Sequence, residues 1–521
     1  MEIEDQLSDV VTQPMADQFP IRAKKYKSPW QLIKELDKNQ RLTFAAAFLG
    51  WSLDAFDYFI VSMTAASIAK DFGVEVSDVT SAITFTLMLR PVGALIFGAL
   101  ADRFGRKWPL MVDILLYSAI ELASGFAPNL TTFVVLRAFF GVAMGGEWGL
   151  GSSLAMESLP AEARGLFSGI LQQGYATGYL LAALFNYAIV TGIGASWRVV
   201  FYVASFPAVL IIFIRAFVPE SDTFERTKAF REREGRTYWD EVKKVFKNYY
   251  GRIIYAIILM VCIKKLFTNR YDKTACTLAV KQITFTLPPP STAFFNFMSH
   301  GSQDLYPAFL QKQMHYSSAD VTITAVIYNI GAILGGTIVG YYSEHWGRRR
   351  AIVVCAILGG CFIALWAFGP NMDSLRLGAF VLQFFVQGAW GVIPAHLNEL
   401  SPPEFRGTFP GLCYQIGNLI SSASAQIEAV LGEKFPVVDS NQNLVFDSKE
   451  KPIPNYALTQ AIFMAIAFFG VIVMTLMGKE HKGKDFTDHL ESAEKEAEIF
   501  ESVIEEYNIK DVQGVESENE Y

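Results

Sequence analysis

The chain has 521 residues, of which 52% are hydrophobic and 14% aromatic, while only 18% are charged. A soluble protein of this length ordinarily forms several domains and carries more charge, so this composition argues against a water-soluble protein. The formal net charge of −7 comes largely from the two ends of the chain, and no nucleic-acid partner is expected.

Long apolar runs recur along the chain, and each extends to about 20 residues, the length of a membrane-spanning helix. They predict an all-α membrane protein that follows a polar tail at residues 1–41, which carries no recognisable cleavable signal peptide. Eleven of the spans are clear, and one more, which lies seventh along the chain, is interrupted. The eleven clear spans are Leu42–Ala69, Val79–Leu100, Pro109–Ala127, Leu130–Leu154, Leu166–Val190, Val199–Val218, Val321–Tyr342, Ala351–Phe368, Leu375–His396, Phe409–Leu431 and Ala457–Met477.

Basic residues are concentrated on one side of the predicted spans. They precede the first span (Lys24–Arg41), follow the second (Arg103–Lys107) and the eighth (His345–Arg350), and fill the linker at residues 219–251. The opposite loops, such as that at residues 127–132, carry little positive charge. The positive-inside rule therefore predicts that both termini, the linker and the acidic tail at residues 479–521 are cytoplasmic.

The chain repeats itself at one offset. GALADRFGRK begins at Gly98 and GYYSEHWGRR at Gly340 (340 − 98 = 242), and ESLPAEARG at Glu157 returns as ELSPPEFRG at Glu399. We expect the repeated charges to pair at the cytoplasmic helix ends and to gate the protein; the alternative is that they only anchor loops. The predicted gating residues are Gly98, Asp102, Gly105, Arg106, Glu344, Gly347 and Arg348.

These motifs resemble the signature of the major facilitator superfamily and its degenerate second copy, and RAFFGVAMG at residues 137–145 resembles the fourth-helix pattern of that superfamily. The resemblance covers nearly all of residues 42–478. It implies twelve helices in two bundles related by the internal repeat, residues 42–218 and 252–478, with a substrate site between them near mid-membrane.

Residues 296–307, NFMSHGSQDLYP, place a polar stripe in an apolar region. On a helix, Asn296, His300, Gln303 and Asp304 share one face, with Ser299 and Ser302 beside it. Ionisable groups inside a membrane are costly and usually mark a functional site. The alternative is a polar cluster for helix packing, which explains Asn296 better than it explains a histidine one turn from a carboxylate.

This stretch also resembles the seventh-helix motif of the fungal Jen-type carboxylate permeases: Asn, Ser or Thr, His, Ser or Thr, then Gln-Asp. The resemblance implies proton-coupled import of lactate, pyruvate or short dicarboxylates at the plasma membrane. It also implies that Asn296, His300 and Asp304 take part in transport and that the Gln303–Asp304 step binds substrate. The second-helix arginine of that family corresponds to Arg90.

Arg90 lies inside the second span, and an arginine is a natural anchor for a carboxylate because it pairs bidentately. The alternative is a structural pair with Asp54, Asp57 or Glu147, and both interpretations hold if the substrate displaces an internal acid. Glu147 either carries the coupled proton or neutralises Arg137. Asp54 and Asp57 are further candidates for proton coupling, with His300 and Asp304 as the principal ones.

Amides in the fifth and eleventh spans complete the candidate substrate site. Gln173 and Gln415 lie 242 residues apart, and Asn418 follows on the same helix as Gln415. They are either donors around one cavity or amides that pack helices together. The resemblance to the carboxylate permeases favours substrate contact for Gln415 and Asn418.

The seventh span begins as RIIYAIILMVCI but continues into charged residues and three prolines before the polar stripe. Charged residues in lipid are costly, and proline breaks a helix interior. Joining Cys262 to about Ala293 would give one ordinary span. We therefore expect residues 264–292 to be a gene-model insertion, such as a translated intron.

Two other functions compete with carboxylate symport: a sugar or polyol facilitator, and a nutrient receptor that does not transport. No nucleophile–base set or cofactor loop occurs, so neither an enzyme nor a cofactor is expected, and the coupling ion is H⁺. The five cysteines have no metal-ligand spacing, so no metal is expected. Lys482 and Lys484 in the tail are candidate ubiquitin acceptors for the endocytic machinery, or ordinary solvated lysines.

Overall fold

The computed structural model describes residues 27–74, 76–216, 219–233, 289–401, 405–422, 424–438, 442–446, 452–478, 480–483 and 486. The chain divides into two compact units, residues 1–35 and 36–521. The first unit contributes the short helix α2 (Pro29–Glu35), and the second contributes every other described helix. Most of the linker, the start of the seventh span and most of the acidic tail lie outside the described residues.

The first half of the second unit contains the six spans predicted before residue 219. Asp37 and Gln40 form a reciprocal capping box where the first span begins, and Gly73 ends that helix with a left-handed backbone (φ 67°). The elements are α3 (Lys38–Phe72), α4 (Val76–Phe104), α5 (Lys107–Gly125), α6 (Leu130–Met144), α7 (Glu147–Ser158), α8 (Arg164–Gln172), α9 (Gly174–Asn186), the π-helix η1 (Tyr187–Gly192), α10 (Trp197–Ala216) and the linker helix α11 (Asp222–Arg233).

The second half repeats this arrangement, and three of its described spans are broken into pairs of helices. Its elements are α14 (Pro289–Gln303), α15 (Tyr306–Ala308), the π-helix η2 (Phe309–Gln313), α16 (Ser318–Trp346), α17 (Arg348–Cys361), α18 (Ile363–Phe368), α19 (Met372–Trp390), α20 (Ile393–Leu400), α21 (Phe409–Ser421), α22 (Ser424–Lys434) and α23 (Tyr456–Met477). All eleven clear spans predicted from the sequence fall on these helices.

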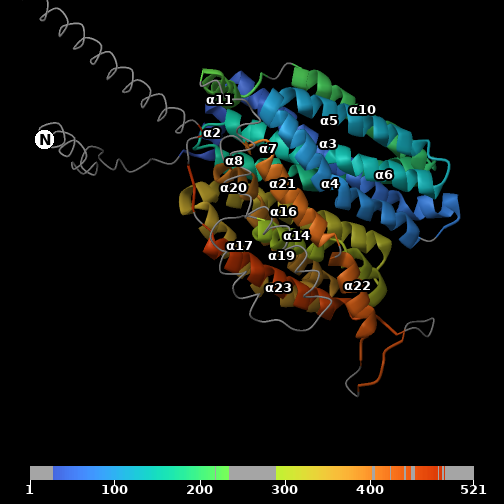
Figure 1. Cartoon of the computed structure of the whole chain (residues 1–521). Helices are drawn as coiled ribbons and strands as arrows, with labels where there is room; N and C mark the ends of the chain where they lie inside the picture. Colours follow the sequence, from blue (N-terminus) through green and yellow to red (C-terminus); the bar gives the residue numbers. More distant parts are fainter. Residues whose placement is uncertain are drawn as a thin grey trace, which may run out of the picture. The chain divides into compact units, whose positions relative to one another are not determined.

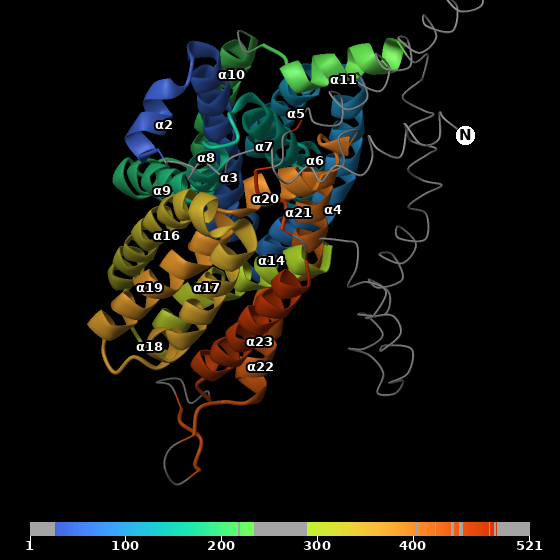
Figure 2. The same ribbon diagram turned by 90° about the vertical axis from the view of Figure 1, so that its left-hand side faces the viewer.

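The internal repeat is visible in the helix bounds. Adding 242 to the bounds of α4 gives those of α16, and adding it to the combined bounds of α6 and α7 gives those of α19 and α20. In Figures 1 and 2 the helices of each half lie together, blue to green for the first half and yellow to red for the second. The two repeated bundles expected from the sequence are therefore present.

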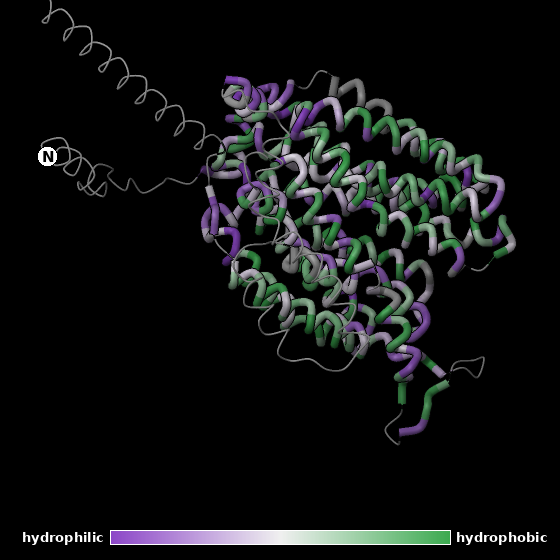
Figure 3. Tube along the Cα trace, in the orientation of Figure 1, coloured by the Kyte–Doolittle hydropathy of each residue, from purple (hydrophilic) through white to green (hydrophobic). Residues whose placement is uncertain are grey.

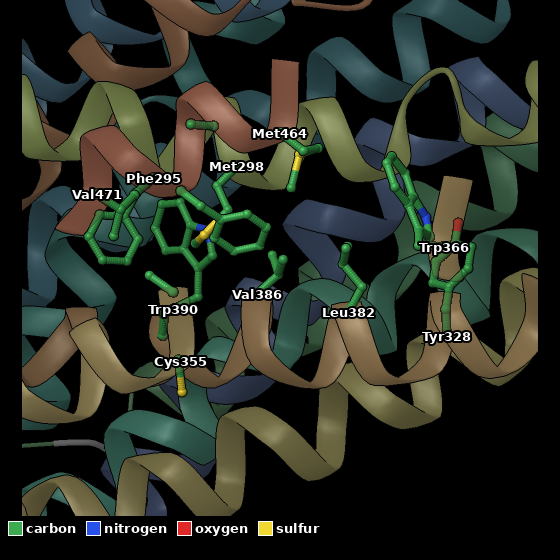
Figure 4. Close-up of a cluster of buried hydrophobic side chains, with 14 of the residues drawn as sticks. Phe295, Met298, Tyr328, Cys355, Trp366, Leu382, Val386, Trp390, Met464 and Val471 are labelled. Atoms are coloured by element: carbon green, nitrogen blue, oxygen red, sulfur yellow. The ribbon is translucent and has the colours of Figure 1, made fainter. Parts of the chain in front are cut away.

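Each half has its own apolar core. One cluster contains side chains between Ala46 and Ala204, and the other is built mainly from residues between Phe295 and Val471. Figure 4 shows part of the second core, where Phe295 lies against Trp390 at 5.5 Å between ring centroids. Trp51 and Trp148 belong to the first half of the chain but pack into the second core, so aromatic side chains join the two bundles.

Seven described helical stretches are long and apolar enough to cross a membrane. Their outer faces carry large exposed apolar side chains, such as Phe139 at 61% and Phe469 at 68%. Figure 3 shows the long helices dominated by hydrophobic residues (green). A soluble protein rarely exposes so much contiguous apolar surface, and a lipid bilayer covers it without cost.

From the sequence, the three prolines at residues 288–290 were expected to end a helix. Instead, α14 begins at Pro289, because a first helical turn tolerates residues that lack a backbone N–H. The last four residues of the predicted insertion thus form the start of α14, and residues 264–288 lie outside the described residues. The 15 residues of α14 span only about 22 Å, less than the roughly 30 Å of a bilayer core.

Candidate functional site

His300 connects two helices of the second half. Its Nδ1 lies 3.0 Å from Oδ2 of Asp304, the residue after α14, and its Nε2 lies 3.3 Å from Asn418 Oδ1 on α21. Asn418 in turn donates to Gln415 Oε1 at 2.8 Å. Both partners of the imidazole are acceptor oxygens, so both hydrogen bonds form together only when each ring nitrogen carries a proton. This geometry therefore fits a protonated imidazolium.

The rest of the polar stripe faces a different helix. Gln303 donates to Gln383 Oε1 on α19 at 2.9 Å, and the Gln383 amide donates to Ser302 Oγ at 2.8 Å. Asn296 on α14 is buried, at 1% exposure, whereas the Asp304 side chain is 36% exposed. The stripe predicted as one face therefore splits between α19 and α21.

Arg90 on α4 forms a buried ion pair with Asp54 on α3, with 3.2 Å between Nη2 and Oδ2. The guanidinium lies 5.8 Å from the centre of the Tyr58 ring, and it is close enough to His300 and Tyr414 to act on them electrostatically. The structural pairing weighed from the sequence is thus present. Arg90 Nε and Asp54 Oδ1 have no hydrogen-bond partner among the described residues.

Other buried acids of the first half lie near this pair. Asp57 is fully buried close to Glu121 and Asp54, and neither of its carboxylate oxygens has a hydrogen-bond partner within the described part of the chain. Arg137 pairs with Glu121 on α5 at 2.5 Å. The described ion-pair partner of Arg137 is therefore Glu121, an acid that the sequence pattern did not single out. Glu147 lies near Asp54.

Gln173 and Gln415 occupy equivalent places in the two bundles. Gln415 Nε2 lies 3.5 Å from Gly145 O in the opposite half. Gln173 donates to Gly169 O at 3.3 Å, and its amide packs against Gly336 of the opposite half. Gln415 joins the His300 chain through Asn418, whereas Gln173 has no such hydrogen bond among those described. Only Gln415 meets the expectation of one shared polar cluster.

Aromatic side chains missed by the sequence reasoning surround this cluster. Tyr414 lies between Trp148 and Trp390, with ring centroids 4.4 and 5.5 Å away. The two tryptophans are themselves separated by 242 residues, so the repeat offset was a signal that could have found them. Trp51 adds an edge contact to Tyr414 at 6.2 Å, and the ring cluster thereby includes both halves.

The first copy of the repeated motif joins the two halves. We call the part of the bundles that carries residues 98–107 and 340–349 the motif end. Asp102 accepts hydrogen bonds from the backbone of Gly407 (2.7 Å) and from the backbone and hydroxyl of Thr408 (3.0 and 2.6 Å). A Cβ at Gly98 would stand 2.6 Å from Thr408 Cα, so only glycine permits this approach.

Arg106 completes that copy with Glu157 at 3.1 Å and Asp102 at 3.6 Å. Burial of the guanidinium opposes its charge, but the carboxylates of Glu157, Asp102 and Glu220 together raise the pKa of Arg106 above its ordinary value. The arginine therefore stays charged at any physiological pH. The predicted pairing of Asp102 with Arg106 is present, with Glu157 as the closer partner.

The second copy reproduces this arrangement. Arg348 binds Glu399 through two hydrogen bonds of 2.9 and 3.1 Å and binds Glu344 at 2.7 Å. Gly105 and Gly347 both have φ of 95°, which side-chain-bearing residues rarely adopt. Beyond these predicted residues, Glu220 accepts from the backbone N–H groups of Arg106 and Lys107, and Glu480 accepts from that of Arg349.

The segment after α23 lies on the motif end. Phe486 is buried, and its ring lies 3.6 Å from the guanidinium of Arg164 and 4.1 Å from that of Arg406. Lys482 donates to Glu344 O at 2.7 Å, so it is not an ordinary solvated lysine. Lys484 lies outside the described residues. No group of three or more metal-ligating side chains that could hold a metal ion occurs among the residues described.

Two repeated helix bundles with charged side chains between them define a polytopic membrane transporter. The family model described as sugar (and other) transporter matches residues 42–249, and the model described as major facilitator superfamily matches residues 291–505. The chain is 30% identical over 465 residues to a carboxylic acid transporter protein homolog of Saccharomyces cerevisiae, covering 88% of this chain and 72% of that protein. The chain belongs to the major facilitator superfamily.

Other relatives carry different names. The chain is 25% identical over 455 residues to the sialic acid transporter NanX of Escherichia coli, covering 87% of this chain and 96% of that one. Among solved structures, the proton:xylose symporter XylE matches with a TM-score of 0.59 at 19% identity, over 86% of this chain and 97% of that chain. The human organic anion transporter MFSD10 matches with a TM-score of 0.59 at 13% identity, over 84% and 99%. These structural matches show the fold alone.

Proposed function

We propose that this protein imports short mono- or dicarboxylates, of the lactate, pyruvate and succinate class, together with protons. The observation that carries the proposal is the position of a buried arginine near a histidine whose two hydrogen bonds fit the protonated ring. The resemblance of residues 296–304 to the Jen-type motif and the name of the yeast relative support the same class of substrate.

In this proposal Arg90 binds the substrate carboxylate in place of Asp54. The unsatisfied Nε of Arg90 offers a donor that the internal pair leaves unused. Hydrogen bonds come from the amides and hydroxyls around it, with Asn418 and Gln415 on one side and the Gln303–Gln383 pair on another. Asn296 and Gln173 complete the proposed contacts. A sugar site would not need a buried guanidinium, which is why we rank that function lower.

The proton is held by His300 and Asp304, and the buried acids Asp54, Asp57 and Glu147 are secondary candidates. An anion and a proton together carry no net charge. Moving one elementary charge across the membrane potential costs about 2.3 kcal/mol per 100 mV, and a neutral pair avoids that cost. Proton coupling thus allows a monoanion to enter against a potential that is negative inside.

Transport proceeds by alternating access, with the motif end as the gate. The cross-half hydrogen bonds of Asp102 and those of Ser153 with Arg406 O (2.5 Å) and Ser168 with Gly391 O (2.7 Å) hold this end closed. The positive-inside bias places the motif end in the cytoplasm of a plasma-membrane protein with both termini inside. The structure then corresponds to a state closed toward the cytoplasm, and the tails serve turnover by the ubiquitin machinery.

The test compares two forms of the chain, as given and without residues 264–292, in cells that lack carboxylate carriers. Uptake of labelled lactate and succinate is measured at pH 5 and pH 7.5, with surface delivery of both forms checked. Uptake at pH 5 by the shortened form alone would support both carboxylate symport and the insertion. Absence of uptake by either form at the surface would reject the proposed function in favour of a sugar facilitator or a receptor.

A further inference from the structure

Glu428 on α22 is a buried carboxylate to which the sequence pattern assigns no role. The residue is 0% exposed, and neither of its carboxylate oxygens has a hydrogen-bond partner in the described part of the chain. No ion pair of Glu428 is found among those residues either. A buried acid without a cation and without a hydrogen bond of ordinary geometry is rare, because its charged form loses several kcal/mol of hydration with little compensation.

The carboxylate packs against the helix that carries His300 and Asp304. A Cβ added at Gly301 would stand 2.9 Å from Glu428 Oε1, so this oxygen lies directly against the backbone of α14 between His300 and Ser302. Glycine at position 301 is what permits the approach. The acid therefore contacts the helix turn that contains the candidate proton site.

Few groups face Glu428 within the described part of the chain. From α14 and the residue that follows it, they are His300, beside Gly301, and Asp304, which is close enough to act on Glu428 electrostatically. From α23, Gln460 lies nearby without a hydrogen bond of ordinary geometry, Thr459 donates to the backbone oxygen of Glu428 at 3.2 Å, and Tyr456 packs one turn further along. On α22 itself Glu433 is exposed.

These neighbours include an acid but no lysine or arginine that pairs with Glu428. Two nearby carboxylates hold one shared proton more readily than two negative charges, since like charges disfavour double ionisation. Of the two, Glu428 is the more deeply buried and Asp304 is 36% exposed. Because burial disfavours the charged form, the shared proton is expected on Glu428, and the exposed Asp304 lies 3.0 Å from His300 Nδ1.

We propose that Glu428 is a second proton-binding residue of the transporter, which exchanges its proton with Asp304. In this step the two carboxyl groups approach within hydrogen-bonding distance. The O–H bond of the Glu428 carboxylic acid then breaks and an O–H bond to the Asp304 carboxylate forms, so total charge does not change. Protonation of Asp304 removes its negative charge and so weakens its ion pair with His300. This inference rests on the proposed function, because it assigns a role within the same transport cycle.

The test separates net uptake from exchange. Purified protein in lipid vesicles is assayed for proton-driven accumulation of labelled lactate and for exchange of labelled against unlabelled lactate at equal pH on both sides. Glu428→Gln keeps the shape of the side chain but cannot hold a titrating proton. We expect it to retain exchange and to lose the rise in accumulation between pH 7.5 and pH 5. Glu428→Asp should recover part of that rise.

Glu433→Gln, on the same helix but exposed, is the matched control and should behave as the unchanged chain. Accumulation with the unchanged pH profile in Glu428→Gln would overturn the proposal. Loss of exchange together with accumulation would also overturn it, since the residue would then serve packing or substrate binding.

An infrared readout keeps this inference distinct from the proposed function. If the unchanged chain moves no lactate, the carboxylate proposal fails, but the protonation of Glu428 can still be measured. The carbonyl stretch of a protonated carboxylic acid should then be present in the unchanged chain and in Glu433→Gln, and should be reduced in Glu428→Gln. An identical band in all three proteins would overturn the inference.

Discussion

The two halves of this chain are alike at the motif end and unlike in the interior. At the motif end, Arg106 binds Glu157 and Asp102 in the first half, and Arg348 binds Glu399 and Glu344 in the second. Each of these residues in the first half lies 242 positions before its equivalent in the second half. The same backbone conformation, φ of 95°, recurs at the glycine before each arginine.

The interior shows no such agreement. The charged residues of the first half have neutral equivalents at the same offset: Arg90 with Ala332, Arg137 with Ala379, Glu147 with Ala389, Asp54 with Asn296 and Asp57 with Ser299. Conversely, His300 is matched by Tyr58, and Glu428 by Asn186. The repeat therefore keeps the ion pairs at the motif end and differs in the buried charged side chains of the interior.

This difference suggests a division of labour between the halves. The first half supplies a buried arginine, which suits the recognition of an anion that replaces its paired acid Asp54. The second half supplies a histidine, two acids and amides, which suits the binding of a proton and the hydrogen bonding of a substrate. Each prediction below tests one side of this comparison.

The largest effect is expected at Arg90. Replacing it with alanine removes the proposed anchor and leaves Asp54 buried without its cation, which costs about 3–5 kcal/mol of stability. Carboxylate uptake should fall to background. The paired variant Arg90→Ala with Asp54→Asn should recover stability in a thermal assay but not uptake, and uptake by this paired variant would contradict the assignment of anion binding to the first half.

At His300 the expected effect is on pH dependence. His300→Gln retains hydrogen-bonding groups but cannot become an imidazolium, so uptake should no longer rise as pH falls. Uptake is expected to rise at low pH because the two acceptor oxygens around the ring stabilise its protonated form, which acid favours. Asn418→Ala removes one acceptor and should shift the pH profile of uptake less than His300→Gln does. An unchanged profile in His300→Gln would place proton coupling elsewhere.

The two copies of the gate should respond unequally. Asp102→Asn weakens the charge-assisted hydrogen bonds to Gly407 and Thr408 in the opposite half, each of which contributes about 1.5–3 kcal/mol when the acceptor is charged. Glu344→Gln loses one partner of an arginine that keeps two hydrogen bonds to Glu399. The rate of lactate exchange should therefore change more in Asp102→Asn. Equal effects would show that the gate is functionally symmetric.

The smallest effects are expected at the paired glycines. Alanine at Gly105 or Gly347 must adopt a strained backbone, at a cost of about 1–3 kcal/mol. The new Cβ would stand 2.3 Å from the Glu220 carboxylate at Gly105, but 3.0 Å from that of Glu480 at Gly347. Thermal unfolding should show the larger loss of stability for Gly105→Ala. Alanine at Gly360, which has open space around it, is the control.

Much of this architecture followed from the sequence. Apolar runs of about 20 residues predicted eleven spans, because a bilayer leaves the backbone no alternative to a helix of that length. The 242-residue offset predicted the two bundles and the ion pairs at the motif end. The spacing of His300 and Asp304 predicted their contact, because residues four apart in a helix are neighbours on one face.

The partners across helices were decided only by the tertiary structure. Periodicity shows which residues share a helix face, but the rotation and tilt of each helix determine what that face meets. Arg90 had three candidate acids and binds Asp54, Arg137 binds Glu121 rather than Glu147, and Gln303 meets Gln383. Glu428 shows most clearly what the sequence could not predict. Its place in an apolar stretch does not reveal a role, and only the folded chain shows that it is buried beside Gly301.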